Sequence, residues 1–292
     1  MDATLTSHIV KSLFSIGSLI APTLAGNLAF QLFGKPWPAQ ASSAREKALA
    51  VVGTQQLAGA NRFRVSCGRS DVQAYHFPNR SRAGTVILVH GWTSQASHLM
   101  GLLAPLMEQG FGVVCFDFPA HGESRGTTTN IIECAKALQC VASLFSDIHG
   151  IVAHSFGGPV TALALAGSPS RNMAFDVKKI ALLASPNESA FVIHAFEDAI
   201  GLQPQAQSDF EAKFEALCEC PLDHFTGSKY FSRIDRPMLV LHGDNDCEIP
   251  QTHGLRYGDL GRCDFVSLKN VGHRDILYVP EVGERIGRFM AS

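Results

Sequence analysis

Three side chains that lie far apart in the sequence have the types and settings that acyl transfer by a nucleophile requires. Ser155 follows an apolar run and is flanked by the small residues Ala153 and Gly157, a Gly-x-Ser-x-Gly-like pattern with alanine at its first small position. This pattern predicts a sharp strand-to-helix turn that exposes the serine hydroxyl. His273 follows the last apolar run through a short glycine-containing loop and is the candidate base, while Asp246 is the candidate acid that orients it.

Other residues compete for two of these roles. The segment HGDNDCEIP offers three carboxylates after one apolar run, so Asp244 and Glu248 are alternatives to Asp246, and a solvated acidic loop without a role in catalysis is a further alternative. His154 adjoins Ser155, but neighbours on a sharp turn point in different directions, so we expect His154 to point away from the hydroxyl. Asp246 remains the preferred acid.

An acyl-transfer site also needs donors for a developing oxyanion. The backbone N–H of Trp92, which follows Gly91 at the end of an apolar run, is expected to pair with the N–H of Phe156. His121 and Ser124 end another apolar run, and we interpret them as supports of a turn near the site, with direct contact as the alternative. The predicted oxyanion donors are therefore Trp92 and Phe156.

The elements that must position these residues alternate along the chain. Short apolar runs, typical of strands covered on both faces, alternate with helix-like segments, which predicts an α/β fold with a mostly parallel sheet and helices on both faces. Residues 188–235 interrupt the alternation with a phenylalanine-rich, helix-like insertion, interpreted as a lid, or alternatively as a segment packed on itself. The expected strands are 85–89, 113–118, 148–153, 180–184, 238–241 and 265–268, with an edge hairpin at 62–67 and 71–77.

Residues 1–40 form an N-terminal apolar helical segment. Residues 12–34 carry no charge, and a polar stripe opposes a stripe of Ile and Leu side chains at nearly helical spacing. We expect residues 9–33 to dock on the protein or to lie on a membrane surface. A single membrane span and a cleaved signal, with a cleavage-like sequence at residues 39–41, are the alternatives.

Composition restricts the class of partner. The chain has 292 residues, 17% of them charged, and a net charge of −2, so it lacks the basic excess of a nucleic-acid-binding protein. Its eight cysteines form no C-x-x-C pair and several lie in apolar runs, which favours a reduced, cytoplasmic chain. We therefore expect a small-molecule, ester-like substrate, with no metal and no cofactor; the oligomeric state stays open.

Five motifs together resemble a known family. VILVHGW, FDFPAHGES, VAHSFGG, VLHGDNDCEIP and NVGHRDIL occur in the order found in serine hydrolases of the α/β-hydrolase superfamily, of the esterase, lipase and serine aminopeptidase kind. The resemblance implies a core at residues 60–187 and 236–292 with a lid between them. It also implies that Asp246 is the acid and that Trp92 supplies an oxyanion N–H. The expected reaction is hydrolysis of esters with an apolar acyl or alcohol group; acyltransferase, thioesterase, peptidase and carbon–carbon bond hydrolase are alternatives.

Overall fold

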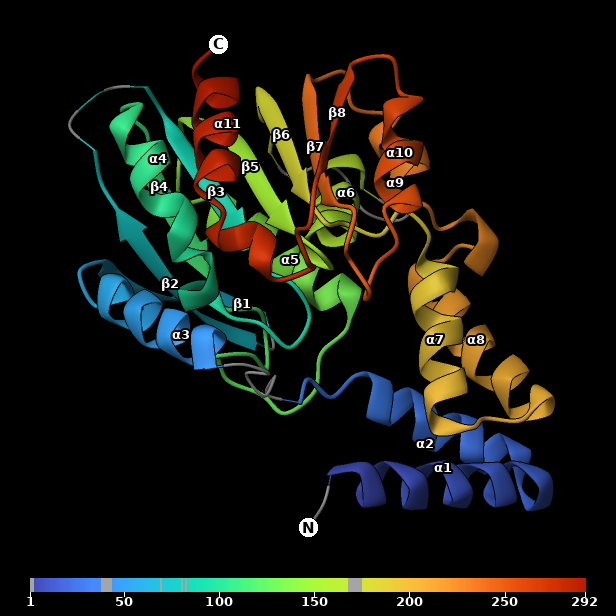
Figure 1. Ribbon diagram of the computed structural model, residues 1–292. Helices are drawn as coiled ribbons and strands as arrows, with labels where there is room; N and C mark the ends of the chain where they lie inside the picture. The colour runs from blue at the N-terminus through green and yellow to red at the C-terminus, as the bar shows by residue number, and fades with distance from the viewer. Residues whose placement is uncertain (1–2, 38–43, 69, 80, 82, 168–174) are drawn as a thin grey trace. The chain divides into compact units, whose positions relative to one another are not determined.

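The structure is a computed structural model that describes residues 3–37, 44–68, 70–79, 81, 83–167 and 175–292 (Figure 1). The chain divides into two compact units, of which the first combines residues 1–35 with 188–226 and the second combines 36–187 with 227–292. The N-terminal helices and most of the insertion therefore belong to one unit. The cleavage-like sequence at residues 39–41 lies outside the described residues.

The second unit is built on an eight-stranded sheet with the order β1-β2-β4-β3-β5-β6-β7-β8. β1 pairs antiparallel with β2, and β2 antiparallel with β4, whereas all the other pairs are parallel. The edge hairpin and the mostly parallel sheet predicted from the sequence are confirmed. The strands are β1 (Asn61–Cys67), β2 (Ser70–Phe77), β3 (Thr85–Val89), β4 (Gly112–Phe116), β5 (Ile148–His154), β6 (Lys179–Leu183), β7 (Met238–Gly243) and β8 (Cys263–Leu268).

Helices cover both faces of this sheet, so its central strands are buried throughout. Every residue of β3 and β4 is buried, which explains their continuous apolar sequences. α4 packs with α11 on one face, and α5 packs with α6 on the other (Figure 1). The helices and 3-10 turns of this unit are α3 (Ala44–Leu57), η1 (Ala96–Leu102), α4 (Leu103–Glu108), α5 (Ile131–Ala142), α6 (Gly157–Ala166), α9 (Gly227–Phe231), α10 (Thr252–Gly258), η3 (Asp275–Tyr278) and α11 (Pro280–Ala291).

The first unit is helical. It comprises α1 (Ala3–Ile20), α2 (Pro22–Phe33), α7 (Ser189–Ile200), α8 (Pro204–Cys218) and η2 (Leu222–His224). α2 and α8 approach closely, because a Cβ at Gly26 would lie 2.8 Å from the carbonyl oxygen of Ala206. The ring of Phe210 is buried against Phe30 and Phe33 of α2 and Phe196 of α7. These phenylalanines of the insertion form the core of their own unit.

Small residues of α1 and α2 face this core, and large aliphatic ones face outward. Ser18, Ala25 and Ala29 are buried, and Ser15 Oγ donates to the carbonyl oxygen of Gly201 at 3.0 Å. Within the described part of the chain, no helix combines the length and hydropathy needed to cross a membrane. Among the residues of these two helices whose burial is described, the exposed large aliphatic side chains are Ile9, Leu13, Ile16, Leu19, Ile20, Leu24 and Leu28, here called the aliphatic stripe.

Candidate active site

Ser155 occupies a tight turn between β5 and α6. Its φ of +52° lies in the left-handed region, and its N–H donates to the carbonyl oxygen of Leu183 at 2.9 Å. A Cβ at Gly157 would lie 2.7 Å from the carbonyl oxygen of Val89 and 2.8 Å from that of His90, so this position requires glycine. The turn therefore has the strained geometry that the residue pattern predicts.

The structure brings the three predicted catalytic side chains together, although 118 residues separate the serine from the histidine. His273 Nε2 lies 2.9 Å from Ser155 Oγ, and His273 Nδ1 lies 2.8 Å from Asp246 Oδ2. A carboxylate accepts hydrogen bonds, so Nδ1 carries the hydrogen and Nε2 is left to accept the hydrogen of the Ser155 hydroxyl. The arrangement can remove a proton from the serine as the oxygen attacks.

The Asp246 carboxylate is held in its charged form. Burial alone would raise its pKa, but hydrogen bonds from His242, His273 and the Ile249 N–H outweigh burial and hold the pKa well below its usual range. Oδ1 accepts the N–H groups of Glu248 at 2.9 Å and Ile249 at 2.8 Å. Oδ2 lies 3.3 Å from His242 Nε2 in addition to its contact with His273. Asp246 can therefore stabilise a positive imidazolium beside it.

The two competing carboxylates are engaged elsewhere. Asp244 Oδ1 accepts the backbone N–H of Asn270 at 2.7 Å. Glu248 has a half-exposed side chain that forms an ion pair with Arg274 at 3.3 Å. Asp246, by contrast, has a side chain that is 0% exposed. The environment that fits an orienting acid thus belongs to Asp246.

The predicted oxyanion residues come from two different segments of the chain. Trp92 is in the loop after β3, and Phe156 is the N-cap of α6, where the helix dipole favours negative charge. Their rings meet edge to face, with 5.2 Å between centroids, and both side chains are half-buried. His121 Nε2 accepts the N–H of Thr93 at 3.3 Å and so holds the loop that carries Trp92.

The turn after β4 supports the same loop. The buried Asp117 carboxylate accepts the N–H of Ala96 at 2.8 Å, at the end of the Trp92 loop. Ser124 Oγ donates to the carbonyl oxygen of Asp117 at 2.7 Å and accepts the N–H of Gln73 at 2.8 Å. These backbone hydrogen bonds are the supporting arrangement that the sequence favours for this turn.

Three buried histidines, His90, His121 and His154, surround the site and are here called the buried histidine cluster. Desolvation lowers the pKa of His121 to about 4 and that of His154 to about 3, and it lowers the pKa of His90 well below its ordinary value. Neither ring nitrogen of His154 pairs with the serine hydroxyl: Nε2–H donates to the carbonyl oxygen of His273 at 2.9 Å, and Nδ1 has no hydrogen-bond partner among the described residues. The cluster is therefore neutral and positions loops.

Sequence reasoning assigned no supporting role to His90, His154 or His242. His90 Nε2 accepts the N–H of Phe118 at 2.9 Å, and His242 Nε2 lies 2.8 Å from the carbonyl oxygen of Ile249. Their positions in the sequence were the available signal, because each of these histidines lies within one residue of the end of a parallel strand. The carboxyl ends of such strands form the edge where α/β proteins build their sites.

Solved structures with the same fold include two esterases. Est1E from Butyrivibrio proteoclasticus, in a structure described with ferulic acid bound, is 17% identical, with a TM-score of 0.63 over 78% of this chain and 97% of that one. The esterase Pf2001 from Pyrococcus furiosus is 18% identical, with a TM-score of 0.62 over 88% of this chain and 95% of that one. At these identities the similarity establishes the fold.

Sequence comparison gives the family. The chain is 26% identical over 192 residues to the uncharacterized protein YqkD of Bacillus subtilis, and the match covers 62% of this chain and 61% of that relative. The chain thus spans less than two thirds of the length of this curated relative. A sequence model described as "Alpha/beta hydrolase family" matches residues 86–283, which include the nucleophile turn, the Asp246 loop and the His273 loop. This chain therefore belongs to the alpha/beta hydrolase family.

Proposed function

We propose that this chain is a serine hydrolase that cleaves carboxylic esters through a Ser155–His273–Asp246 triad. The observation that carries the proposal is the continuous hydrogen-bond chain between these side chains, with 2.9 Å from hydroxyl to imidazole and 2.8 Å from imidazole to carboxylate. The nucleophile, the base and the orienting acid lie within one unit and come from separate loops at one edge of the sheet. The esterases among the solved neighbours agree with this reaction class.

The proposed reaction proceeds through an acyl-enzyme. Ser155 Oγ bonds to the ester carbonyl carbon while its proton passes to His273 Nε2, and the carbonyl oxygen becomes an oxyanion held by the N–H groups of Trp92 and Phe156. The intermediate collapses, and His273 gives the proton to the departing alcohol. Water then attacks the acyl carbon and loses a proton to His273. When this second intermediate collapses, His273 gives the proton to Ser155 Oγ and the carboxylic acid leaves. Asp246 stabilises the imidazolium in both halves.

An apolar acyl or alcohol group fits the surroundings of the nucleophile. The half-buried ring of Phe156, the residue after Ser155, lies 5.2 Å from the half-buried ring of Trp92 and 6.0 Å from that of Phe118. Aromatic rings contribute large apolar contact areas to a bound group. The lid interpretation of residues 188–235 stays a prediction, and Phe210 does not support it, because its ring is buried in its own unit.

Hydrolysis of p-nitrophenyl esters with short and medium acyl chains tests the proposal. Ser155→Ala is expected to lower kcat by at least about 10³-fold, because the nucleophile is lost. Ser143→Ala, at the exposed end of α5, is the matched control and should keep full activity. Labelling of Ser155 by a fluorophosphonate is expected as well. Full activity of Ser155→Ala would refute the triad, whereas turnover of thioesters, peptides or an acyl acceptor in place of esters would favour the alternative reactions on the same residues.

For location, we propose a cytoplasmic enzyme that contacts membranes peripherally through residues 9–33. All eight cysteines have free thiols, which agrees with a reducing compartment. The aliphatic stripe is the feature that fits a lipid surface, with Leu13 66% and Ile20 79% exposed. Flotation with phosphatidylcholine vesicles should capture the chain, and Leu13→Ser/Ile20→Ser should abolish capture. The control Val51→Ser, at an exposed valine of α3, should leave capture unchanged; equal capture of all variants would refute the contact.

A further inference from the structure

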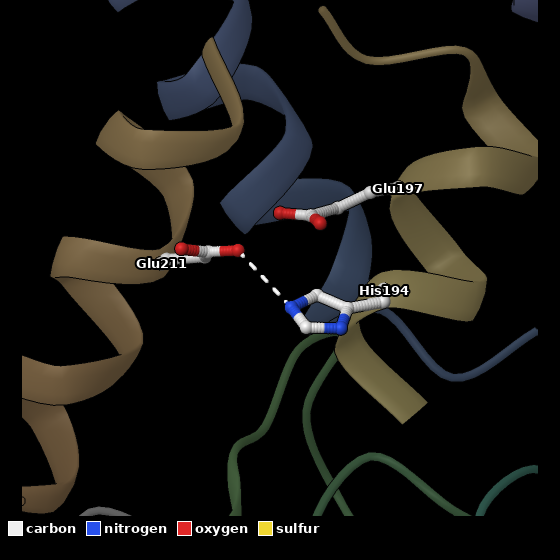
Figure 2. Close-up of side chains that lie close together, drawn as sticks. All are labelled: His194, Glu197 and Glu211. Carbon is white, nitrogen blue, oxygen red and sulfur yellow. Dashed lines mark ion pairs between the residues drawn. The ribbon is translucent and has the colours of Figure 1, made fainter. Parts of the chain in front are cut away.

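A second group of side chains with ligand chemistry belongs to the helical unit, which contains none of the residues assigned to hydrolysis. His194 and Glu197 are three residues apart on α7 and share one face of that helix, while Glu211 comes from α8 (Figure 2). His194 Nε2 lies 3.3 Å from Glu211 Oε1, and a donor atom from each of the three residues lies within 4.8 Å of the other two. The group joins two helices.

Glu197 is the unusual member of this group. The residue is only 2% exposed, and within the described part of the chain its Oε1 has no hydrogen-bond partner. Figure 2 shows its carboxylate directed toward Glu211 and His194. Burying an unpartnered carboxylate is costly, and here burial and the nearby carboxylates of Glu211 and Asp198 raise the Glu197 pKa to about 7. A cation between the two glutamates would give Glu197 Oε1 a partner and would offset the repulsion between the two carboxylates.

We propose that His194, Glu197 and Glu211 bind a divalent transition-metal ion of the Zn²⁺ type and thereby join α7 to α8. An imidazole nitrogen with two carboxylates suits zinc, whereas Mg²⁺ and Ca²⁺ prefer oxygen ligands alone. Three protein ligands leave a fourth position for water.

The spacing is compatible with a tetrahedral ion. Zinc bonds of about 2.0–2.2 Å place neighbouring donors roughly 3.3–3.6 Å apart. The His194–Glu211 separation of 3.3 Å already meets this value. The donor atom of Glu197 lies no more than 4.8 Å from those of the other two residues. To reach the roughly 3.3 Å spacing of zinc ligands, the Glu197 carboxylate needs to move by at most about 1.5 Å, which rotation of its side chain supplies. The half-exposed His194 leaves a route for the ion from solvent.

Isothermal titration calorimetry with ZnCl₂ on the metal-free full chain, without a histidine tag, tests the site. We expect one ion per chain. His194→Ala, which alters an exposed side chain and so leaves folding intact, and the isosteric Glu197→Gln should each weaken binding by at least about tenfold. The matched controls His224→Ala and Asp223→Asn, at exposed positions of the same unit, should change it by less than about twofold. Co²⁺ should give a visible absorption band that His194→Ala removes.

Other outcomes would overturn the proposal. They are the absence of stoichiometric Zn²⁺ binding, binding by His194→Ala equal to that of the parent chain, or Mg²⁺ binding as tight as Zn²⁺ binding. Asp246→Asn should bind Zn²⁺ as the parent does, because that carboxylate belongs to the other unit. Loss of binding in Asp246→Asn would move the ion to the hydrolytic site and refute the assignment. Failure of the ester assay leaves this test unaffected.

Discussion

Replacing Asp246 by asparagine should disable the base while leaving the fold in place. Oδ1 accepts two backbone N–H groups, from Glu248 at 2.9 Å and Ile249 at 2.8 Å, so the carbonyl oxygen of asparagine must take this position. The NH₂ group then occupies the place of Oδ2, 2.8 Å from His273 Nδ1. Because NH₂ donates, Nδ1 must accept, and the imidazole hydrogen moves to Nε2. His273 then meets the Ser155 hydroxyl with a donor instead of an acceptor.

The expected loss is large. An imidazole held in the wrong tautomer lowers kcat by about 10⁴-fold in a Ser-His-Asp triad. At 1.36 kcal/mol per factor of ten, this loss corresponds to about 5.4 kcal/mol of transition-state stabilisation. The assay is steady-state hydrolysis of a p-nitrophenyl ester at pH 7 by purified Asp246→Asn, with circular dichroism to verify that the chain is folded. KM should change little, because Asp246 is buried behind His273 and does not reach the substrate.

Two neighbouring carboxylates provide the control. Asp244→Asn removes a charge two residues away, and its Oδ1 contact with the Asn270 N–H can be kept by the asparagine oxygen. Glu248→Gln removes a half-exposed charge from the same loop. Both variants should keep kcat within about threefold of the parent, as surface substitutions usually do. If Asp246→Asn stayed within tenfold of the parent enzyme while Asp244→Asn lost activity, the assignment of the acid would be wrong.

Three further predictions concern stability. Histidines of the unfolded chain bind protons as the pH falls through their pKa of 6.5, whereas the buried histidine cluster of the folded chain stays neutral until the pH reaches about 4 or lower. The free energy of unfolding therefore has its full value, with respect to these histidines, above pH 6.5 and decreases as the pH falls toward 4. Urea unfolding at pH 7 and pH 5 should show a loss of roughly 1 kcal/mol per pH unit for each histidine, and equal stability would contradict the burial argument. Asn130→Ala removes the side chain that accepts the Glu133 N–H at 3.0 Å and should cost about 1 kcal/mol in the same assay; an unchanged midpoint would exclude the cap. Gly243→Ala places a Cβ in steric overlap with the carbonyl oxygen of Val271 and should lower stability by at least about 2 kcal/mol, measured by thermal melting.

The sheet was predictable because its central strands are buried on both faces. Continuous apolar runs such as residues 85–89 and 180–184 are typical of doubly covered parallel strands when the chain alternates them with helical segments. Their ends were less predictable: β4 ends at Phe116, two residues before the apolar run does, and β7 continues to Gly243. Strand ends depend on pairing with neighbours. β7, for example, pairs with β8 as far as Gly243 and Leu268, and a single sequence does not state such contacts.

The meeting of the three candidate catalytic side chains was predictable for a topological reason. Each follows a parallel strand, and the carboxyl ends of parallel strands share one edge of the sheet. The sequence alone left Asp244 and Asp246 as alternatives, because both follow β7 within three residues. The loop geometry separates them. Asp246 folds back to cap the N–H groups of Glu248 and Ile249, which fixes its second oxygen beside His273.

The orientation of the N-terminal helices was not predictable from their own pattern. The Ile and Leu stripe would ordinarily be expected to face a protein core, but α2 presents Ala25, Gly26 and Ala29 to α8 instead. Small residues allow helix backbones to approach closely: a Cβ at Gly26 would lie only 2.8 Å from the carbonyl oxygen of Ala206. Which face of an apolar helix is buried depends on the partner, and here the partner lies in the insertion, which the chain reaches only after residue 188.

Burial of His154 removes a positive charge from the neighbourhood of His273. The ring of His154 lies 5.0 Å from that of His273. A charged His154 would oppose an imidazolium at His273 by roughly 3 kcal/mol at an effective dielectric constant near 20. Burial keeps His154 neutral, whereas the Asp246 carboxylate stays charged 2.8 Å from Nδ1 of the proposed base His273. The same burial that makes the folded chain sensitive to acid thus removes a charge that would work against the proposed proton transfer from Ser155.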